Sequence, residues 1–481
     1  MKKILFLLFT FFLIFGQQVF AADNSSSKFV TLVYPVRGRD LWVDPNVNHL
    51  EKITDRLKNL EFPSTWLFQY DALIDPELVA YLNKNCQLCE FGLFFEVSKT
   101  FSTDASVSYD TSDNNWARPN KVFLSGYRLL ERKRLIDTVI AKFKSVFGYY
   151  PKSIGAWYID PYSLQYLVNK YGVQGYVSVA DQFDTDAQKY WGKPWGYPFY
   201  PDKFNILAPA TNLQAKLGLV ELQWAQRDPT DGYGQGVKFS QNSFQANDYI
   251  GNGNDTTYFK NLLHKYLDTK NDEFAQVTIG LEVGQELENF SDEHLRQLDV
   301  IKSLSSLTPM TISGFTQWYQ ESFPALSPIT IVSDGQTSWI NMLCYRVGIK
   351  KFDDSFRTFD LRFYDQKELS PDIFSREKNR QLVREINLKS EGFTESCRKR
   401  NWLDDKTIEW KTRKSEFIEK LGNLLSFIKW SVIDGRKIIG IGVQKDTLFG
   451  YWWNHGFGLY HFGFQQLVKF QSPGSLILNR L

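Results

Sequence analysis

The sequence predicts an α/β domain with a parallel sheet, followed by a smaller β-rich domain. From residue 28 to about residue 325, short β-type runs alternate with segments of helical periodicity, which is typical of βαβ units around a parallel sheet. After Pro324 and Pro328 this alternation stops and short strands follow one another. The chain has 481 residues, more than a single hydrophobic core usually serves, so two domains are expected.

Seven strands are predicted in the first domain, each a short run of apolar, β-branched and aromatic residues. They are Phe29–Tyr34, Thr65–Gln69, Phe91–Val97, Ile154–Ile159, Gly175–Ala180, Leu219–Trp224 and Gln276–Val283. On this pattern alone, a barrel and a doubly wound sheet fit equally well. Both folds place functional residues at the carboxyl ends of the strands.

Helices are predicted between these strands from the spacing of apolar residues. The clearest is Glu131–Phe147, closed by Gly148, and another runs from Pro161 to Tyr171 and ends at Gly172. The others are Asn48–Leu60, a helix that begins at Pro76 and reaches Leu82, and Asp292–Leu304. Three long irregular stretches, at 98–121, 182–218 and 225–257, each follow a strand, and loops of that length are usually functional.

The second domain, residues 326–481, is predicted to be β-rich and sandwich-like. Its apolar and polar residues alternate in Ile329–Val332, Trp339–Val347, Phe359–Tyr364 and Ile438–Val443, and an aromatic run covers Phe449–Phe464. A charged span near residues 398–430 interrupts these strands and is predicted to be helical.

The first 22 residues have the architecture of a secretory signal peptide. Lys2 and Lys3 precede the apolar run Ile4–Phe15, and small residues follow at Ala21 and Ala22. The apolar run is about twelve residues long, short of the ~20 that a membrane-spanning helix needs. We therefore expect a secreted or otherwise extracytoplasmic protein with no membrane span after signal cleavage.

Charge and composition narrow the possible partners. The formal net charge is +2 and no basic block is present, so nucleic acid is not an expected partner. Aromatic residues make up 16% of the chain. They can simply fill cores, but those near the predicted strand ends also suit stacking on sugar rings.

The four cysteines predict one or two disulfides in an exported protein. Cys86 and Cys89 form a C-x-x-C pair, whereas Cys344 and Cys397 lie far apart. The C-x-x-C lacks a thioredoxin-like context, which disfavours a redox pair, and no second Cys or His pair accompanies it to complete a zinc site.

Acidic residues follow five of the seven predicted strands. They are Glu96 after the third strand, Asp160 after the fourth, Asp181, Asp184 and Asp186 after the fifth, Asp228 after the sixth and Glu282 at the seventh. Carboxylates crowded at one rim raise one another's pKa values, as acid–base catalysis requires. The first strand leads into Arg37 and Arg39, two guanidinium groups that can hold an anion.

Each acidic residue also has a structural explanation. Asp160 precedes Pro161 and can be the N-cap of the following helix. Asp184 and Asp186 can be turn residues. Glu96 or Glu282 can pair with an arginine for stability alone.

Several chemistries are disfavoured. None of the five histidines lies at a predicted strand end, which argues against a histidine-based metal site there. The sequence has no G-x-S-x-G elbow, no P-loop and no strand-linked G-x-G-x-x-G. No cofactor and no metal are expected.

Residues 28–325 resemble the polysaccharide deacetylase and family-57 glycoside hydrolase superfamily. The resemblance rests on the number of strands and on three segments, Glu90–Leu93, Tyr158–Tyr162 and Tyr171–Gly175. It implies a (β/α)7 barrel. The metal-binding aspartates and histidines of the deacetylases have no counterparts here, because Tyr34 and Pro35, the stretch Phe94–Lys99, and Glu282 occupy those places.

The resemblance to the glycosidase branch implies a pair of catalytic carboxylates at the ends of the fourth and seventh strands, here Asp160 and Glu282. Glu96 and Asp181 are expected to assist them. The expected substrate-binding residues are Arg37, Trp157, Tyr158, Asp184, Trp191, Trp195, Trp224 and Arg227.

The leading hypothesis is thus an exported hydrolase that acts on a polysaccharide or cell-wall glycan. A catalytically silent glycan-binding protein on the same barrel is the main alternative, and a metal-dependent deacetylase is the third.

Overall fold

The structure, a computed structural model, describes residues 27–186, 188–268, 273–343, 345–352, 355–364, 369–373, 375–386 and 388–391, and after these only the strands β17 to β22. The predicted signal peptide, Cys344 and Cys397 lie outside the described residues. Across the part of the chain that is described, no helix combines the length and the apolar character needed to cross a membrane.

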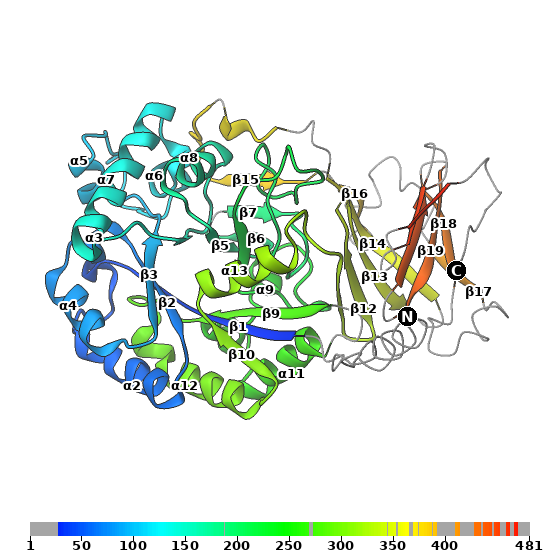
Figure 1. The fold of residues 1–481 in the computed structure, drawn as a ribbon, viewed down its shortest axis with the longest axis horizontal. Coiled ribbons are helices and arrows are strands. Elements are labelled where there is room, and N and C mark those ends of the chain that lie inside the picture. Colours follow the sequence, from blue (N-terminus) through cyan, green and yellow to red (C-terminus); the bar gives the residue numbers. More distant parts are fainter. Residues whose placement is uncertain are drawn as a thin grey trace, which may run out of the picture.

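A nearly closed parallel β-barrel forms the first part of the chain (Figure 1). The strand order around the barrel is β9-β1-β2-β3-β4-β5-β8, so the predicted (β/α)7 barrel is confirmed. The strands are β1 (Ser27–Val36), β2 (Ser64–Phe68), β3 (Cys89–Phe94), β4 (Ser153–Gly155), β5 (Gly175–Val179), β8 (Val220–Trp224) and β9 (Phe274–Gly280). An additional short strand, β10 (Leu307–Met310), pairs with the beginning of β1 and was not predicted.

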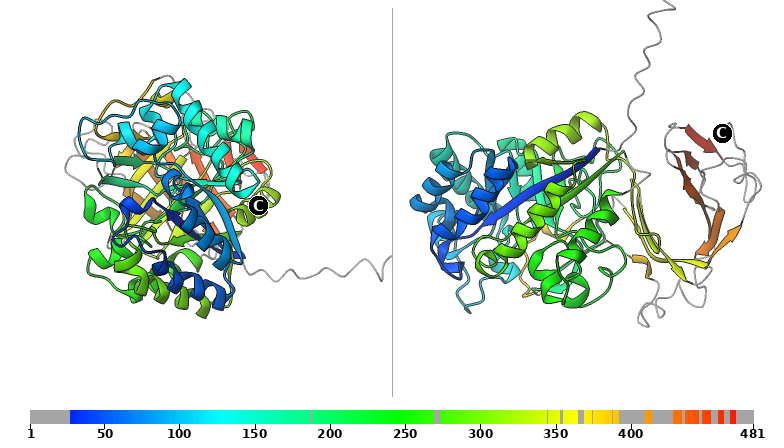
Figure 2. Two further views of the ribbon diagram at one scale, coloured as in Figure 1. Left: turned by 90° about the vertical axis from the view of Figure 1, so that its left-hand side faces the viewer. Right: turned by 90° about the horizontal axis from the view of Figure 1, so that it is seen from below.

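Helices surround the barrel (Figures 1 and 2). The longer ones are α2 (Glu51–Leu60), α4 (Pro76–Asn85), α7 (Leu129–Phe147), α8 (Pro161–Tyr171), α11 (Thr256–Leu267), α12 (Leu287–Ser303) and α13 (Ile312–Ser322). Short helical turns in the loops are η1 (Arg39–Leu41), η2 (Val47–Leu50), α3 (Tyr70–Leu73), α5 (Lys99–Asp104), α6 (Pro119–Val122), η3 (Leu124–Gly126), α9 (Val237–Ser240) and α10 (Ala246–Gly251).

The ends of the best-predicted helices follow from local chemistry. Asp160 caps α8 and Pro161 occupies its first turn, where a missing N–H costs nothing. Gly148 and Gly172 end α7 and α8 in the left-handed conformation, at φ of 83° and 69°, which glycine adopts without steric cost. The sequence signals used for these helices are therefore the ones that shape them.

The gap between β8 and β9 is bridged by the side chain of Gln226. No backbone ladder joins these two strands. Instead, Gln226 Nε2 donates to the carbonyl of Gln276 at 3.0 Å and to that of Gly196 at 2.8 Å, while its Oε1 accepts from the N–H of Thr278 at 2.9 Å. A fully buried side-chain amide thus takes the place of a backbone peptide group in closing the barrel.

Antiparallel strands follow the barrel, as predicted for a β-rich second part, and Figure 2 shows the sheet bending along its length. The described strands are β11 (Thr330–Ser333), β12 (Thr337–Asn341), β13 (Tyr345–Phe352), β14 (Ser355–Phe363), β16 (Leu388–Glu391), β17 (Glu409–Arg413), β18 (Ile428–Ile433), β19 (Arg436–Gln444), β20 (Thr447–Trp452), β21 (Gly458–His461) and β22 (Gln466–Lys469). Within the span 398–430, predicted to be helical, the described residues are strands: all of β17 and the start of β18.

A third, small sheet joins the two parts of the chain. A hairpin of β6 (Gln182–Thr185) and β7 (Gln188–Trp191) follows β5, and β15 (Leu382–Glu385) pairs with β7 in parallel. The turn η4 (Pro371–Ile373) precedes β15. Residues 369–386 therefore return from the second part of the chain to the rim of the barrel (Figure 1).

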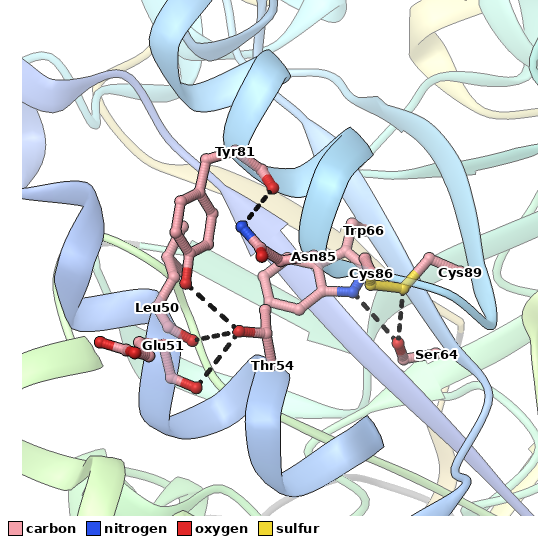
Figure 3. The surroundings of a disulfide bond; sticks show 9 residues. All are labelled: Leu50, Glu51, Thr54, Ser64, Trp66, Tyr81, Asn85, Cys86 and Cys89. Atoms are coloured by element: carbon pink, nitrogen blue, oxygen red, sulfur yellow. Dashed lines mark hydrogen bonds between the residues drawn. A yellow bond between two sulfur atoms is a disulfide. The ribbon is translucent and has the colours of Figure 1, made fainter. Parts of the chain in front are cut away.

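A disulfide links Cys86 and Cys89 between α4 and β3 (Figure 3). The Cys89 sulfur lies 3.4 Å from Ser64 Oγ on the neighbouring strand. The bridge lies where the chain enters β3, at the end of the barrel opposite the carboxyl ends of the strands.

We expect the Gln226→Ala variant to lose about 2–3 kcal/mol in the free energy of unfolding, because it leaves a buried N–H and two carbonyls without partners. Urea denaturation of the full chain measures this. Gln285→Ala, at an exposed position, is the matched control and should change stability by less than about 0.5 kcal/mol. Equal losses in both variants would contradict the bridging role of Gln226.

Candidate functional site

An arginine and two glutamates meet at the carboxyl end of the barrel. Arg37 follows β1, Glu96 follows β3 and Glu282 follows β9. Arg37 Nε and Nη2 donate to the two carboxylate oxygens of Glu96, each at 2.8 Å, and Nη1 donates to Glu282 Oε2. We call these three residues the Arg37 cluster.

The cluster is buried except at Glu282. The side chains of Arg37 and Glu96 are 2% and 1% exposed, whereas that of Glu282 is 12% exposed. Burial alone would lower the pKa of Arg37, but the charges of Glu96 and Glu282 raise it. The guanidinium therefore stays charged, and Glu282 is the member of the cluster that solvent or a ligand can reach.

Hydrogen bonds to neighbouring residues fix the cluster. Gln69 Oε1 accepts from the N–H of Gly38 at 2.8 Å, and Trp42 Nε1 donates to the carbonyl of Arg37 at 2.6 Å. On the other side, Gln245 Nε2 donates to Glu282 Oε1 at 3.0 Å and to Glu286 Oε1 at 2.7 Å. Both oxygens of Glu282 thus have a donor.

Glu286 is a second buried acid beside Glu282. It is 3% exposed, and its Oε2 accepts from the backbone N–H of Glu282 at 2.9 Å. Burial, together with the charge of Glu282, raises the pKa of Glu286 well above its usual range. The surroundings of Glu286 therefore favour its protonated form, while Glu282 is ion-paired with Arg37.

Asp186 reaches the same region from the turn of the β6–β7 hairpin. It is exposed, with a φ of 55°, and its neighbour Asp184 has a φ of 53°. The surrounding protein and the charge of Glu282 raise the pKa of Asp186, while Arg37 opposes this rise. The Asp186 carboxyl therefore interacts electrostatically with two members of the Arg37 cluster.

Aromatic rings line the cluster. The guanidinium carbon of Arg37 lies 5.7 Å from the ring centre of Phe94, 5.5 Å from that of Trp116 and 5.8 Å from that of Trp157. Trp116 and Trp157 are partly exposed, so part of each side chain can meet a ligand. Trp224 packs behind Trp157, with 5.8 Å between the ring centres.

Asp160 does not join this cluster. It has no exposed surface, and its carboxylate accepts from Arg132 Nη1 at 2.7 Å, from the N–H of Ser163 at 3.0 Å and from Ser163 Oγ at 2.7 Å. Arg132 also donates to the carbonyls of Asp372 and Ser375, so residues 369–386 cover this region. The alternative noted for Asp160, an N-cap, is the role that its contacts describe, and the pairing of Asp160 with Glu282 is not supported.

Asp181 and Arg227 are also engaged in the protein interior. Asp181 accepts from Arg346 Nη1 at 2.5 Å and from the N–H groups of Gly192 and Lys193. Arg227 Nε donates to the carbonyl of Asp181 at 2.8 Å. Both residues are buried and shape the loops around the site rather than its surface.

Four of the five predicted sugar-binding aromatics are buried and cannot stack on a ligand. Trp191 packs against Phe183, with 3.9 Å between ring centres, and Trp195 stacks on Trp339 at 3.8 Å. Tyr158 donates to Asp372 at 2.6 Å. Trp224 is buried as well, which leaves Trp157 as the predicted aromatic with an accessible face.

The strand-end acids are thus neutralised by different cations. Glu96 and Glu282 share Arg37, while the other pairs are Asp160 with Arg132, Asp181 with Arg346, and Asp228 with Lys265. The expected crowding of unpaired carboxylates is not what forms the site. Trp116, Asp186, Gln245 and Glu286 belong to it and were not singled out from the sequence, although Asp186 stood in the acidic run after β5.

The residues at the barrel mouth do not fit the metal of deacetylase barrels. Within the described ranges, no group of three or more His, Cys, Asp or Glu side chains could hold a metal ion. A guanidinium already pairs with the two glutamates that face each other at the centre of the mouth, and a second cation there would be repelled. The groups that a ligand meets at the mouth are therefore carboxyls and aromatic rings.

The barrel fold is similar to that of solved structures with low sequence identity to this chain. A proposed glycoside hydrolase/deacetylase from Parabacteroides distasonis is similar in structure, with a TM-score of 0.54 and 16% identity over 75% of this chain and 91% of that chain.

Other similar structures include a proposed polysaccharide deacetylase from Mycobacterium smegmatis, with a TM-score of 0.38 and 11% identity over 65% of this chain and 96% of that chain. A peptidoglycan deacetylase from Bacillus subtilis has a TM-score of 0.29 and 12% identity over 63% of this chain and 97% of that chain. Residues 119–326 match a family model described as a domain of unknown function with a solved structure, DUF3863. No curated protein matches the chain.

We expect Glu286→Gln to change how stability depends on pH. The folded protein holds a proton on Glu286 that the unfolded chain releases above about pH 4.3, so this residue makes the wild type lose stability as pH rises from there. The variant lacks this loss. The free energy of unfolding of the variant minus that of the wild type should therefore increase by roughly 1 kcal/mol or more between about pH 5 and about pH 8. Urea unfolding at several pH values measures the difference.

Glu288→Gln is the matched control, since Glu288 is exposed on the same helix, α12. Its difference from the wild type should stay flat over that pH range. A flat difference for Glu286→Gln as well would mean that Glu286 is ionised in the folded protein.

Proposed function

We propose that this protein hydrolyses a polysaccharide or cell-wall glycan with two carboxyl groups, Glu282 and Asp186, outside the cytoplasm. One observation carries the proposal: Glu282 is a partly exposed carboxylate paired with Arg37, and burial together with the charge of Glu282 raises the pKa of a second carboxyl, Asp186. One ionised and one protonated carboxyl are what glycosidic hydrolysis requires. Extracytoplasmic action follows from the leader predicted for residues 1–22 and rests on that prediction.

The bond changes can be assigned to these residues. Asp186 gives its proton to the glycosidic oxygen as the bond between this oxygen and the anomeric carbon breaks. Glu282 supplies negative charge to the opposite side, either by attacking the anomeric carbon or by taking a proton from the attacking water. Water provides the hydroxyl group of the new reducing end. Trp116 and Trp157 would offer their faces to the sugar rings on either side.

A glycan-binding protein without catalysis is the second candidate, and one observation favours it. Both oxygens of Glu282 already have hydrogen-bond donors, Arg37 and Gln245. A carboxylate held in this way is a poorer nucleophile than a free one. On this alternative, the aromatic faces bind sugar rings and no product is released.

We expect Glu282→Gln to lower the rate of reducing-end release by about a thousandfold or more while glycan binding persists, because the variant keeps the shape and loses the charge. The substrate is first found by incubating the full-length mature chain with a panel of polysaccharides. Glu288→Gln, at an exposed position on α12, should retain full activity. Full activity of Glu282→Gln would overturn the assignment, and binding without any release by the wild type would favour the second candidate.

We expect the wild-type rate to fall at high pH as Asp186 loses its proton. In Asp186→Asn the decline at high pH should disappear along with most of the activity.

Asp160→Asn tests the pairing suggested by the sequence. It should reduce stability, since Arg132 then lacks its buried counter-charge, but the folded protein should keep its pH–rate profile.

A further inference from the structure

The hairpin that carries Asp186 lies outside the barrel sheet. Its strands β6 and β7 pair with each other, and its third partner, β15, comes from the second part of the chain. The conformation of this hairpin therefore depends on residues that follow the barrel in sequence. Asp184 in β6 and Asp186 at the turn adopt left-handed backbone conformations that non-glycine residues keep only where the surroundings hold them.

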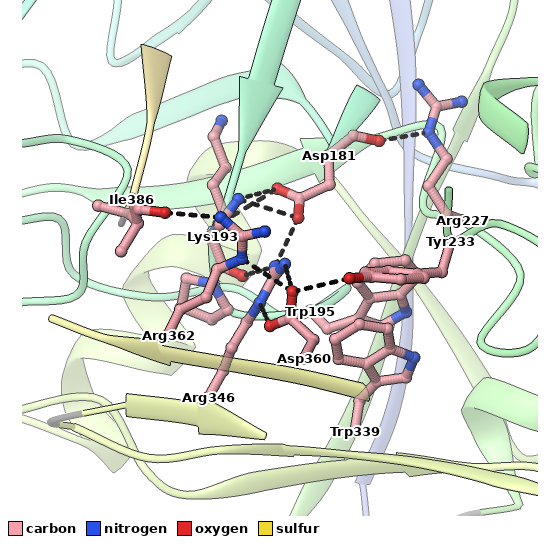
Figure 4. Close-up of polar contacts among 12 residues, drawn as sticks. Asp181, Lys193, Trp195, Arg227, Tyr233, Trp339, Arg346, Asp360, Arg362 and Ile386 are labelled. Atoms are coloured by element: carbon pink, nitrogen blue, oxygen red, sulfur yellow. Dashed lines mark hydrogen bonds and ion pairs between the residues drawn. The ribbon is translucent and has the colours of Figure 1, made fainter. Parts of the chain in front are cut away.

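A fully buried arginine of the second part, Arg346 on β13, holds the base of the hairpin (Figure 4). Its Nη1 donates both to Asp181 Oδ2 and to the carbonyl of Lys193, each at 2.5 Å. Asp181 precedes β6 and Lys193 follows β7, so one guanidinium nitrogen joins the two ends of the hairpin.

The ion pairs continue from Arg346 and return to the hairpin. Arg346 Nε donates to Asp360 Oδ1 at 3.0 Å, and Arg362 Nε donates to Asp360 Oδ2 at 2.8 Å. Arg362 Nη1 then reaches Glu385 at 3.0 Å, and Glu385 accepts from Lys189, on β7, at 2.6 Å. The series begins at the base of the hairpin and ends on its second strand.

Burial makes this series stiff. Arg346, Asp360 and Arg362 have no exposed surface, and Arg346 lies over the ring of Trp339 at 5.1 Å, which stacks on Trp195. Charges withdrawn from water interact strongly and tolerate little displacement, because each lost contact leaves an uncompensated buried charge.

We propose that Arg346 is a positioning residue for Asp186, and that strands β13 to β15 thereby complete the site at the barrel mouth. Arg346 does not touch the reacting atoms. It fixes the base of the hairpin, and the hairpin carries Asp186, whose pKa is raised by burial and by the charge of Glu282. The catalytic consequence of this inference rests on the proposed function. The structural part, that Arg346 holds the hairpin and thereby Asp186 in place, can be tested without measuring activity.

Replacing Arg346 by methionine tests the inference in the full chain, with Lys351→Met, an exposed position on the same strand, as the control. In Arg346→Met, hydrogen exchange of the amides in residues 182–191 should accelerate, and the pH midpoint of the Asp186 carboxyl, followed by carbon-13 NMR, should move down toward that of an ordinary aspartate. The control should match the wild type in both. Arg346→Lys, which keeps the charge but not the forked geometry, should show smaller changes in the same direction. This variant tests the inference if Arg346→Met does not fold.

On a substrate that the wild type cleaves, kcat/KM of Arg346→Met should fall by about 10–100-fold, and the decline in rate at high pH should begin at a lower pH. A lower melting temperature with an unchanged Asp186 midpoint and an unchanged pH–rate profile would overturn the positioning role. If no glycan is cleaved by any form, the exchange and NMR results still decide the inference, so its failure and that of the proposed function are separable.

Discussion

The ion pairs of Arg37 with Glu96 and Glu282 are the interaction on which the barrel mouth depends. Three strands that are far apart in sequence, β1, β3 and β9, each deliver one member of this cluster. Breaking a buried pair of this kind costs several kcal/mol, because the remaining charge has no partner. The cluster therefore fixes the relative positions of the strand ends, and it leaves one carboxylate, Glu282, at the surface among aromatic rings.

The same principle recurs around the rim, where other buried acids pair with cations. Arg132 holds Asp160, and Arg346 holds Asp181. These arginines differ from Arg37 because they also connect the barrel to the second part of the chain: Arg132 donates to the carbonyl of Asp372, and Arg346 itself lies on β13. The rim is thus shared between both parts of the chain, and a barrel cut at residue 325 would lose the counter-charges that hold its loops.

The sequence predicted the elements well and the site only partly. All seven barrel strands and the ends of α7 and α8 were predicted, because periodicity, Asp–Pro and glycine signals act locally. The strand β10 was missed since it is short, with partly exposed residues. The β6–β7 hairpin was missed because it is completed by β15, almost two hundred residues later. Which acid pairs with which arginine depends on the tertiary structure. The local sequence therefore could not show whether Asp160 or Asp186 is the better candidate for the site.

The central claim is that a glycan is bound and cleaved between Glu282 and Asp186, and a structure with a bound oligosaccharide tests it most directly. The Glu282→Gln variant can be soaked with an oligosaccharide of a polysaccharide that the wild type binds. Sugar rings should lie against Trp116 and Trp157, with a glycosidic oxygen within about 3 Å of the Asp186 carboxyl. An oligosaccharide bound away from the barrel mouth, with the Arg37 cluster untouched, would contradict the claim.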